Sequence, residues 1–517
     1  MVIDSSDNNK RIAKNTIVLY VRMIFIMAIH LYTSRKILEA LGVEDYGIYN
    51  VIGGFVVMFK LISNSLTAAI SRFITFETGR GNINRLKTIF STSVNIQILL
   101  AITIFILLES FGLWFLYNKM TIPENRLDAA FWVFQFSVFT FCVNLITVPY
   151  NAVIIAHEKM SAFAYISILD NILQLCICLS LFYINSDLLI IYAILMALEA
   201  VFIRFVYTRY CKKNFTECVY SITFDKALFK QIFAFSGWNF IGASSSILRS
   251  QGGNLLLNVF FGPHVNAARG ISMNVSSAVL SFSNNFITAI NPQITKHYAC
   301  GNFEYSFRLV IQGAKYSFYL LLFIAIPLLI ETETVLNVWL TEVPPYAVLF
   351  SKLVIVFVLV ENLSNTMITL MLATGNIRNY QIVVGGIQSL NFPVSWLFFK
   401  LGAPPQYTLY IAIFLSFICI FLRLIMLRKM VKFPIWEYVN KVMLNVFFIT
   451  VISLILPLAV HTIIPNSMWR FIIILLISWI SIGVSGLFVG CNRHERNLIM
   501  NYLMAINKKM KHLFLKR

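Results

Sequence analysis

Three cations lie deep within apolar stretches of this 517-residue chain, at Arg22, Lys60 and Arg249. A charge in hydrocarbon costs about 2.5–3.5 kcal/mol even on the mildest scale, so such side chains usually face a bundle interior or a cavity. Arginine offers a two-pronged fork for phosphate oxygens and lysine a compact point charge. The three residues therefore predict a polar lumen within the membrane. The alternative is that each cation pairs with a buried acid and serves folding.

Two acids, Asp170 and Glu361, lie near the middle of other apolar stretches. Each is a candidate coupling site that binds and releases a proton, or else a counter-charge for a neighbouring cation. Three further charges, Arg269, Lys352 and Glu199, lie near the ends of apolar stretches. There a long side chain can reach the membrane interface, and we expect them to do so.

Asparagines repeat at helical spacing within three of the apolar stretches: Asn50 and Asn64 in 46–70, Asn239 in 232–260, and Asn274 and Asn284 in 265–291. Residues three or four apart share one helix face, so each stretch carries a polar stripe. Such stripes indicate a wet lumen whose amides bind the hydroxyl groups of a substrate. Close helix packing, in which asparagine bonds across helices, is the alternative.

Motifs for cofactor or metal chemistry are missing from the sequence. It has no GxxxxGK[ST] loop for a nucleotide, no GxSxG nucleophile, no HExxH and no CxxC. The eight cysteines lie in apolar stretches or on the side expected to be cytoplasmic. We therefore expect no cofactor, no metal ion, no disulfide framework and no enzymatic activity.

The elements that position these residues are apolar stretches near 20 residues long, the length of a membrane-spanning helix. Hydrophobic residues make up 59% of the chain and charged residues 12%. We expect an all-α polytopic membrane protein with about fourteen spans. The expected spans are 15–34, 46–70, 88–108, 129–155, 163–184, 188–207, 232–260, 265–291, 315–331, 347–372, 380–399, 407–427, 442–461 and 470–489.

Lysine and arginine alternate in abundance from loop to loop. If the N-terminus lies inside, the outside loops hold only Arg35, Lys36, Lys119, Arg126, Lys400 and Arg470. This asymmetry is the positive-inside rule, and it predicts that both termini are cytoplasmic. The net charge of +19 then reflects topology and contact with anionic membrane lipids rather than nucleic acid.

An internal repeat divides the chain. Residues 63–75 (SNSLTAAISRFIT) match 283–295 (SNNFITAINPQIT) at an offset of 220, which also relates Gly42 to Gly262 and Gly81–Asn82 to Gly301–Asn302. Residues 152–156 match 369–373 at an offset of 217. Six expected spans separate equivalent points, so the halves run in parallel. We expect a six-helix lobe (1–207), a cytoplasmic linker (208–231), a second lobe (232–430), an appended helix pair (431–490) and a basic cytoplasmic tail (491–517).

Several segments carry a family resemblance: RKILEALGVEDYGIYNVIGG (35–54), SRFITFETGRG (71–81), PYNAVIIAHEKM (149–160) and ATGNIRNY (373–380). They resemble polysaccharide-unit flippases of the multidrug/oligosaccharidyl-lipid/polysaccharide exporter superfamily. The resemblance implies a two-lobed bundle with alternating access in the bacterial inner (cytoplasmic) membrane. It also implies a substrate of oligosaccharide on undecaprenyl diphosphate, moved from the inner to the outer leaflet. Glycosyltransferases and a polymerase of the same pathway are the implied partners.

Two rival functions remain open. One is a multidrug/cation antiporter of the same superfamily, which would favour acids in its lumen. The other is a membrane glycosyltransferase or polymerase, which would usually need a large outer loop, and the expected outer loops are short.

Overall fold

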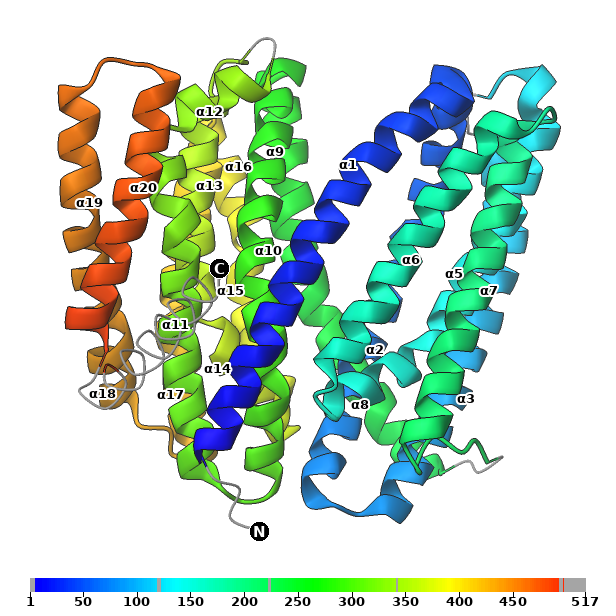
Figure 1. Cartoon of the computed structure of the whole chain (residues 1–517), viewed down its shortest axis with the longest axis horizontal. Coiled ribbons are helices and arrows are strands. Elements are labelled where there is room, and N and C mark those ends of the chain that lie inside the picture. The colour runs from blue at the N-terminus through cyan, green and yellow to red at the C-terminus, as the bar shows by residue number, and fades with distance from the viewer. Residues whose placement is uncertain (1–4, 119–121, 222–224, 341–342, 492–495, 497–517) are drawn as a thin grey trace, which may run out of the picture. The chain divides into compact units, whose positions relative to one another are not determined.

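The structure is a computed structural model that describes residues 5–118, 122–221, 225–340, 343–491 and 496. Every regular element among these residues is a helix (Figure 1). The elements of the first half are α1 (Ser5–Met58), α2 (Lys60–Arg80), α3 (Ile83–Leu107), η1 (Leu108–Gly112), α4 (Leu113–Asn118), η2 (Glu124–Arg126), α5 (Leu127–Ala156), α6 (Met160–Ser180), η3 (Leu181–Tyr183) and α7 (Leu188–Asn214).

The second half begins with α8 (Lys226–Ile247), η4 (Leu248–Gly252), α9 (Gly253–Phe261), α10 (Pro263–Ala299), α11 (Phe303–Ile330), α12 (Thr332–Trp339), α13 (Ala347–Asn362) and α14 (Asn365–Thr374). It continues with α15 (Arg378–Ser389), α16 (Asn391–Lys400), α17 (Tyr407–Val431), α18 (Ile435–Tyr438), η5 (Val439–Leu444), α19 (Asn445–Ile463), α20 (Met468–Ser485) and η6 (Gly486–Gly490). The basic tail expected after residue 490 lies almost wholly outside the described residues.

Eleven helical segments of the described chain are long and apolar enough to cross a membrane. Each overlaps one of the expected spans. The three expected spans that are not among the eleven are 46–70, 232–260 and 265–291, the same three that carry polar stripes. The structure is helical there too, but the asparagines and serines lower the apolarity of those helices. The all-α polytopic membrane fold is thus confirmed, while the count of about fourteen spans stays a prediction.

Several expected spans are interrupted rather than continuous. α1 breaks at Gly42, whose backbone is left-handed (φ 77°, ψ 171°), a conformation that glycine adopts without steric cost. The expected span 46–70 therefore consists of the end of α1 and the start of α2, which meet at Phe59. Similar breaks separate α13 from α14 and α15 from α16. Within a bundle, neighbouring helices can satisfy the backbone groups that such breaks release.

Glycines related by the repeat share their backbone conformation. Gly42 and Gly262 have φ values of 77° and 80°, and Gly81 and Gly301 have 74° and 76°. A left-handed glycine is the usual way to end a helix. The offset of 220 that we read from the sequence therefore relates the same local structures in both halves.

The residues after these glycines match as well. The side chain of Asn82 accepts a hydrogen bond from the backbone NH of Arg85 at 3.1 Å, and Asn302 accepts one from Tyr305 at 3.3 Å. Both asparagines thus satisfy an otherwise unpaired NH at a helix start.

The second match, at an offset of 217, also holds in the backbone. It pairs Glu158 with Gly375, and both are left-handed, with φ values of 57° and 79°. Glutamate rarely adopts this conformation, which costs a residue with a Cβ about 1–2 kcal/mol. Something in the structure must hold Glu158 there.

Contacts divide the chain into two compact units that differ from the sequence halves. Unit 1 comprises Met1–Ser245, Thr288–Ser306 and Thr369–Gly385, and unit 2 comprises Ser246–Ile287, Phe307–Ile368 and Gly386–Arg517. In unit 1, α5 is central and packs against α1, α2, α3 and α7. In unit 2, α13 packs against α17, and α19 packs against α20. Unit 1 thus takes in three segments of the second sequence half, namely most of α8, Thr288–Ser306 and Thr369–Gly385.

Candidate functional site

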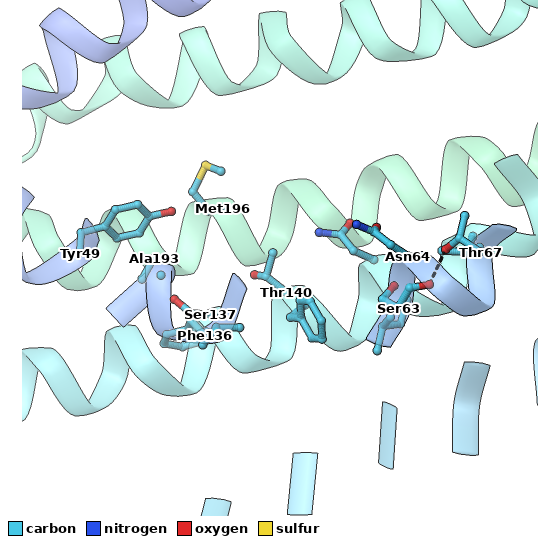
Figure 2. Close-up of a pocket in the computed structure, with 15 residues that line it drawn as sticks. Tyr49, Ser63, Asn64, Thr67, Phe136, Ser137, Thr140, Ala193 and Met196 are labelled. Carbon is cyan, nitrogen blue, oxygen red and sulfur yellow. Dashed lines mark hydrogen bonds between the residues drawn. The ribbon is translucent and has the colours of Figure 1, made fainter. Parts of the chain in front are cut away.

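A cavity of about 440 Å³, here called the main cavity, lies within unit 1. Its polar lining comes from α1, α2 and α5, and Figure 2 shows Tyr49, Asn64 and Thr140 directed into one common space. None of the described residues that line it carries a formal charge. They are Tyr49, Gly53, Val56, Ser63, Asn64, Thr67, Phe136, Ser137, Thr140, Phe141, Asn144, Leu145, Val148, Ala193 and Met196. Hydroxyl and amide groups beside aromatic rings suit a neutral ligand rich in hydroxyl groups.

The most important wall of the main cavity is one that we did not single out in the sequence. On α5, Ser137, Thr140, Asn144, Thr147 and Asn151 follow one another at intervals of three and four residues, so they share one helix face. Three of them line the main cavity. The spacing was visible in the sequence, but bulky apolar residues surround it and we listed this stretch only as an expected span.

A second cavity of about 270 Å³, here called the acidic cavity, holds both carboxyl groups of unit 1 that lie in apolar stretches. Asp170 on α6 and Glu199 on α7 line it, and the Nε2 group of Gln174 donates to Asp170 Oδ1 at 3.2 Å. We expected Glu199 to reach the interface, yet it is buried, with 8% of its surface exposed. The reason is that α6 and α7 pack side by side, which places the two acids within hydrogen-bonding reach.

The two cavities share part of their walls. Thr140, Asn144, Val148 and Met196 line both. A polar surface therefore runs without interruption from the uncharged main cavity to the two carboxyl groups.

Arg22 lies beside this acidic site. Its guanidinium group stacks on the ring of Phe163 at 4.5 Å, and Asp170 and Tyr207 lie within electrostatic range. Its Nε group is buried and makes no hydrogen bond among the described residues. Arg22 thus keeps hydrogen-bonding capacity while its charge is partly balanced by Asp170.

Arg249 and Glu361 form an ion pair in unit 2. Their nearest atoms, Nη1 and Oε1, are 3.5 Å apart, and both side chains are mostly buried. Ser416 Oγ donates to the same carboxylate oxygen at 2.6 Å, and Phe357 lies under the guanidinium group at 4.8 Å. The carboxylate of Glu361 thus faces the guanidinium group of Arg249, and its role as a counter-charge or as a coupling site stays a prediction.

The remaining predicted residues have varied surroundings. Asn64 lines the main cavity. The Oδ1 atom of Asn239 accepts a hydrogen bond from Gln381 at 2.9 Å, a contact between helices. Asn274 and Asn284 are exposed on α10. The side chains of Asn50 and Lys60 lie outside the part of the chain that the structure describes.

A buried carboxylate at Glu158 joins segments from both halves of the sequence. Its side chain is 1% exposed and contacts Arg11 at 2.9 Å and Lys296 at 2.7 Å. Gln293 also donates to it, and Asn15 donates to its backbone carbonyl at 3.3 Å. These contacts hold Glu158 in its left-handed conformation. Burial lowers the pKa of Lys296, and the carboxylate of Glu158 opposes that effect.

A second set of contacts joins the first-half motif to the corresponding segment of the second half. Arg72, on the first copy of the repeated motif, donates to the carbonyls of Leu372 and Ala373 at 3.3 and 3.0 Å. Leu372 and Ala373 belong to the segment that the repeat pairs with the residues before Glu158. A Cβ atom on Gly375 would lie 2.6 Å from Arg72 Nη2, so glycine leaves room for the contact.

These two sets are related by the internal repeat. In one set Gln293 of the 283–295 motif contacts Glu158, two residues after the 152–156 motif, and in the other Arg72 of the 63–75 motif contacts the last two residues of the 369–373 motif. Repeat partners also meet directly, since a Cβ atom on Gly79 would lie 3.2 Å from the Cβ of Ala299. We call these the cross-contacts. They tie the sequence halves together within unit 1.

Among the described residues, no group of three His, Cys, Asp or Glu side chains is placed to hold a metal ion.

The chain resembles solved transporters in fold. One is a MATE protein in a bent conformation (TM-score 0.71, 13% identity, covering 82% of this chain and 95% of that one). Another is an outward-facing multidrug resistance MATE family transporter of the MOP superfamily (TM-score 0.68, 12% identity, 82% and 95%). A third is a MOP superfamily transporter from Pyrococcus furiosus with a binding pocket of reversed polarity (TM-score 0.66, 12% identity, 82% and 96%).

At these identities the likeness establishes the fold, that of a multi-pass membrane transporter. The family is established by sequence. The polysaccharide biosynthesis protein family matches residues 12–310, more than half of the chain, and the protein belongs to that family. The polysaccharide part of the resemblance is thereby confirmed, and the chain shares the fold of solved MOP superfamily transporters. No curated protein matches the chain.

Proposed function

We propose that this protein flips an undecaprenyl-diphosphate-linked oligosaccharide unit from the inner to the outer leaflet of a bacterial cytoplasmic membrane. The observation that carries the proposal is the main cavity, which offers hydroxyl and amide groups beside aromatic rings and whose described lining residues carry no charge. Such a surface matches the hydroxyl groups of a sugar. Membership of the polysaccharide biosynthesis family supports the same substrate class.

The cations would then bind the diphosphate of the substrate. A head group of that charge could not cross bare hydrocarbon, because the cost of desolvating it is prohibitive. Arg22 retains a buried Nε group that makes no hydrogen bond among the described residues, and Arg249 is held by Glu361 at 3.5 Å, a distance longer than a strong charge-assisted bond. Lys60 stays a predicted third member of this set. A diphosphate would compete with the acids for these cations as it passes.

Transport would be secondary, driven by an ion gradient rather than by nucleotide hydrolysis. The acidic cavity supports this part of the proposal, because two neighbouring carboxyl groups can share a proton, and releasing it leaves like charges side by side. Asp170 and Glu199 are the coupling pair that we propose, with Glu361 as a counter-charge. If Asp170→Asn and Glu199→Gln both leave flux and its pH dependence unchanged in proteoliposomes, these carboxyl groups do not couple transport.

The cross-contacts would form and break during the cycle. They join the two sequence halves, so a transporter that alternates access must release them in one of its states. The charge asymmetry of the loops supports a cytoplasmic position for them. Single cysteines at Gly81, Lys213 and Lys509 should then be labelled only from inside the cell. Labelling of any one of them from outside would overturn this topology.

A flux assay with purified protein in proteoliposomes tests the substrate. Lipid-linked oligosaccharide is the first probe and a cationic dye the second. Asn144→Ala and Asn64→Ala should each lower oligosaccharide flux about tenfold, if each amide makes one hydrogen bond to the sugar worth about 1.5 kcal/mol. Asn118→Ala removes an exposed amide outside the main cavity and should leave flux unchanged.

The second candidate function is a cation antiporter, which the acidic cavity and the multidrug MATE neighbours favour. The same assay distinguishes this antiporter from the flippase that we propose. Dye export that depends on Asp170 and Glu199, without oligosaccharide flux, would establish the antiporter and refute our proposal. Arg22→Ala, Lys60→Ala and Arg249→Ala complete the design. Each should lower polysaccharide export at normal membrane abundance. Full export by all three variants at normal abundance would remove the head-group site, and lost abundance would assign the cations to folding.

A further inference from the structure

A third cavity, of about 480 Å³, lies in unit 1 and is here called the basic groove. It is lined by Val94, Ile98, Tyr150, Val201, Arg204, Phe205, Thr208, Lys212 and Tyr220. α3 and α7 form its two walls because both pack against α5, which supplies its floor at Tyr150. The basic groove shares no lining residue with the main or the acidic cavity.

The polar side of the basic groove is a single face of α7. Arg204, Thr208 and Lys212 are four residues apart, so they lie one above the other along about 12 Å of helix. Among the described residues, neither Arg204 nor Lys212 forms an ion pair with a carboxylate. The hydroxyl groups of Tyr150 and Thr208 lie within hydrogen-bonding reach of each other beside them. Two cations and two hydroxyl groups therefore face the same space.

The apolar side is directed outward. Phe205 is 60% exposed and Val201 is 41% exposed, and both lie on a helix apolar enough to span a membrane. Ile98 of α3, which is partly exposed, continues this surface, whereas Val94 is buried deeper in the groove. In a bilayer the exposed side chains would contact acyl chains. The basic groove thus combines a cationic end with an apolar end, which is the pattern of a lipid rather than of a free anion.

The linker after α7 closes the cationic end. The hydroxyl group of Tyr220 donates to Asn95 Oδ1 at 2.7 Å, and the backbone NH of Ser221 donates to Ser91 Oγ at 3.2 Å. Both acceptors are on α3, so the linker crosses from one wall of the groove to the other. It holds the ring of Tyr220 beside Lys212. The groove is therefore bounded on four sides and open towards lipid.

We propose that the basic groove binds one anionic glycerophospholipid. Its phosphate lies at Lys212 and Tyr220, its ester carbonyls accept hydrogen bonds from Arg204 and Thr208, and an acyl chain follows Val201 and Phe205 outward. Basic pockets between helices at the cytoplasmic side are suited to anionic head groups. The leaflet rests on the topology proposed above, whereas the lipid class rests on the groove alone.

Lipid retention by the purified full-length protein tests this inference. Native mass spectrometry would compare phosphatidylglycerol with phosphatidylcholine of the same acyl chains. The wild-type protein should retain phosphatidylglycerol preferentially, and each cation removed should cost about fivefold in that preference. Arg204→Gln combined with Lys212→Gln should therefore lose most of it. Thr208→Glu, which keeps both cations but adds a carboxylate between them, should have the same effect.

The matched control is Arg209→Gln combined with Lys213→Gln. It removes the same charge from the same helix, but both residues are exposed and outside the groove, so the preference should persist. Equal loss in the control, or equal retention of the two lipids by the wild type, would overturn the proposal. A third probe, undecaprenyl phosphate, identifies the source of the phosphate. If it is retained and phosphatidylglycerol is not, the groove binds the carrier lipid and our assignment is wrong.

Discussion

Replacing Glu158 by glutamine should destabilise the protein strongly, because it leaves a cation buried without its partner. The carboxylate is 1% exposed and contacts Lys296 at 2.7 Å, with the lysine side chain 19% exposed. Removing one member of a buried pair costs about 3–5 kcal/mol. The other contact adds little, since Arg11 is 45% exposed and its guanidinium group can return to water. We therefore expect the lower end of that range, about 3 kcal/mol.

A glycine variant separates charge from backbone strain. Glu158→Gly also removes the carboxylate, but it relieves the left-handed conformation (φ 57°), which costs a residue with a Cβ about 1–2 kcal/mol. It should thus be less destabilised than Glu158→Gln by about 1 kcal/mol. Gly375, the repeat partner of Glu158, shows that glycine is accepted at this turn.

The assay is thermal unfolding in detergent at one heating rate, with a double-mutant cycle that adds Lys296→Met. The two substitutions should couple by about 1 kcal/mol or more, since they remove the same interaction.

The pH dependence of the stability of Glu158→Gln has a defined sign. Burial lowers the pKa of Lys296 and Glu158 opposes this, so in Glu158→Gln that pKa falls further. A lowered lysine pKa means that the unfolded state binds more protons, and stability rises with pH. The deficit of Glu158→Gln should shrink as the pH rises towards 10.5, the ordinary lysine value. An unchanged unfolding midpoint, or purely additive effects with Lys296→Met, would refute this reasoning.

Three further predictions concern single positions. Gly79→Ala should destabilise the protein because its Cβ would lie 2.8 Å from a backbone oxygen of α10. Gly237→Ala, whose Cβ would have nothing within 4 Å, should not. Thermal unfolding of the two variants checks this difference. Asn82→Ala and Asn302→Ala should each cost about 1 kcal/mol, and clearly unequal unfolding midpoints would contradict their equivalence in the repeat. Burial raises the pKa of Asp187, but its hydrogen bonds with an arginine lower that pKa overall. The stabilisation that Asp187 contributes is therefore present above the unfolded pKa of 3.8 and is lost as the pH falls through the folded pKa. Asp187→Asn, which keeps the helix cap, should therefore make the unfolding midpoint less sensitive to acid. An unchanged dependence of that midpoint on pH in the acid range would count against the pairing of Asp187 with the arginine.

The repeat and the helices could be predicted well because their causes are local. A left-handed turn needs glycine, so Gly42 and Gly262 mark their turns in the sequence itself. Membrane spans need long apolar runs, so eleven of the expected spans are matched by apolar helices. The stripe on α5 was equally readable. We missed Asn144 because strong apolarity around it masked a regular spacing.

What the sequence determined by itself is therefore the class of protein: helical, membrane-spanning, internally repeated and a member of the polysaccharide family. Tertiary structure alone decided which charges meet. Glu199 stands near the end of an apolar stretch, and only the packing of α7 on α6 brings it beside Asp170. Glu158 lies in a short turn, and only the approach of α1 and α10 makes it a buried ion-pair centre. Partners on different helices leave no local pattern, because the free energy that joins them exists only once the helices have packed.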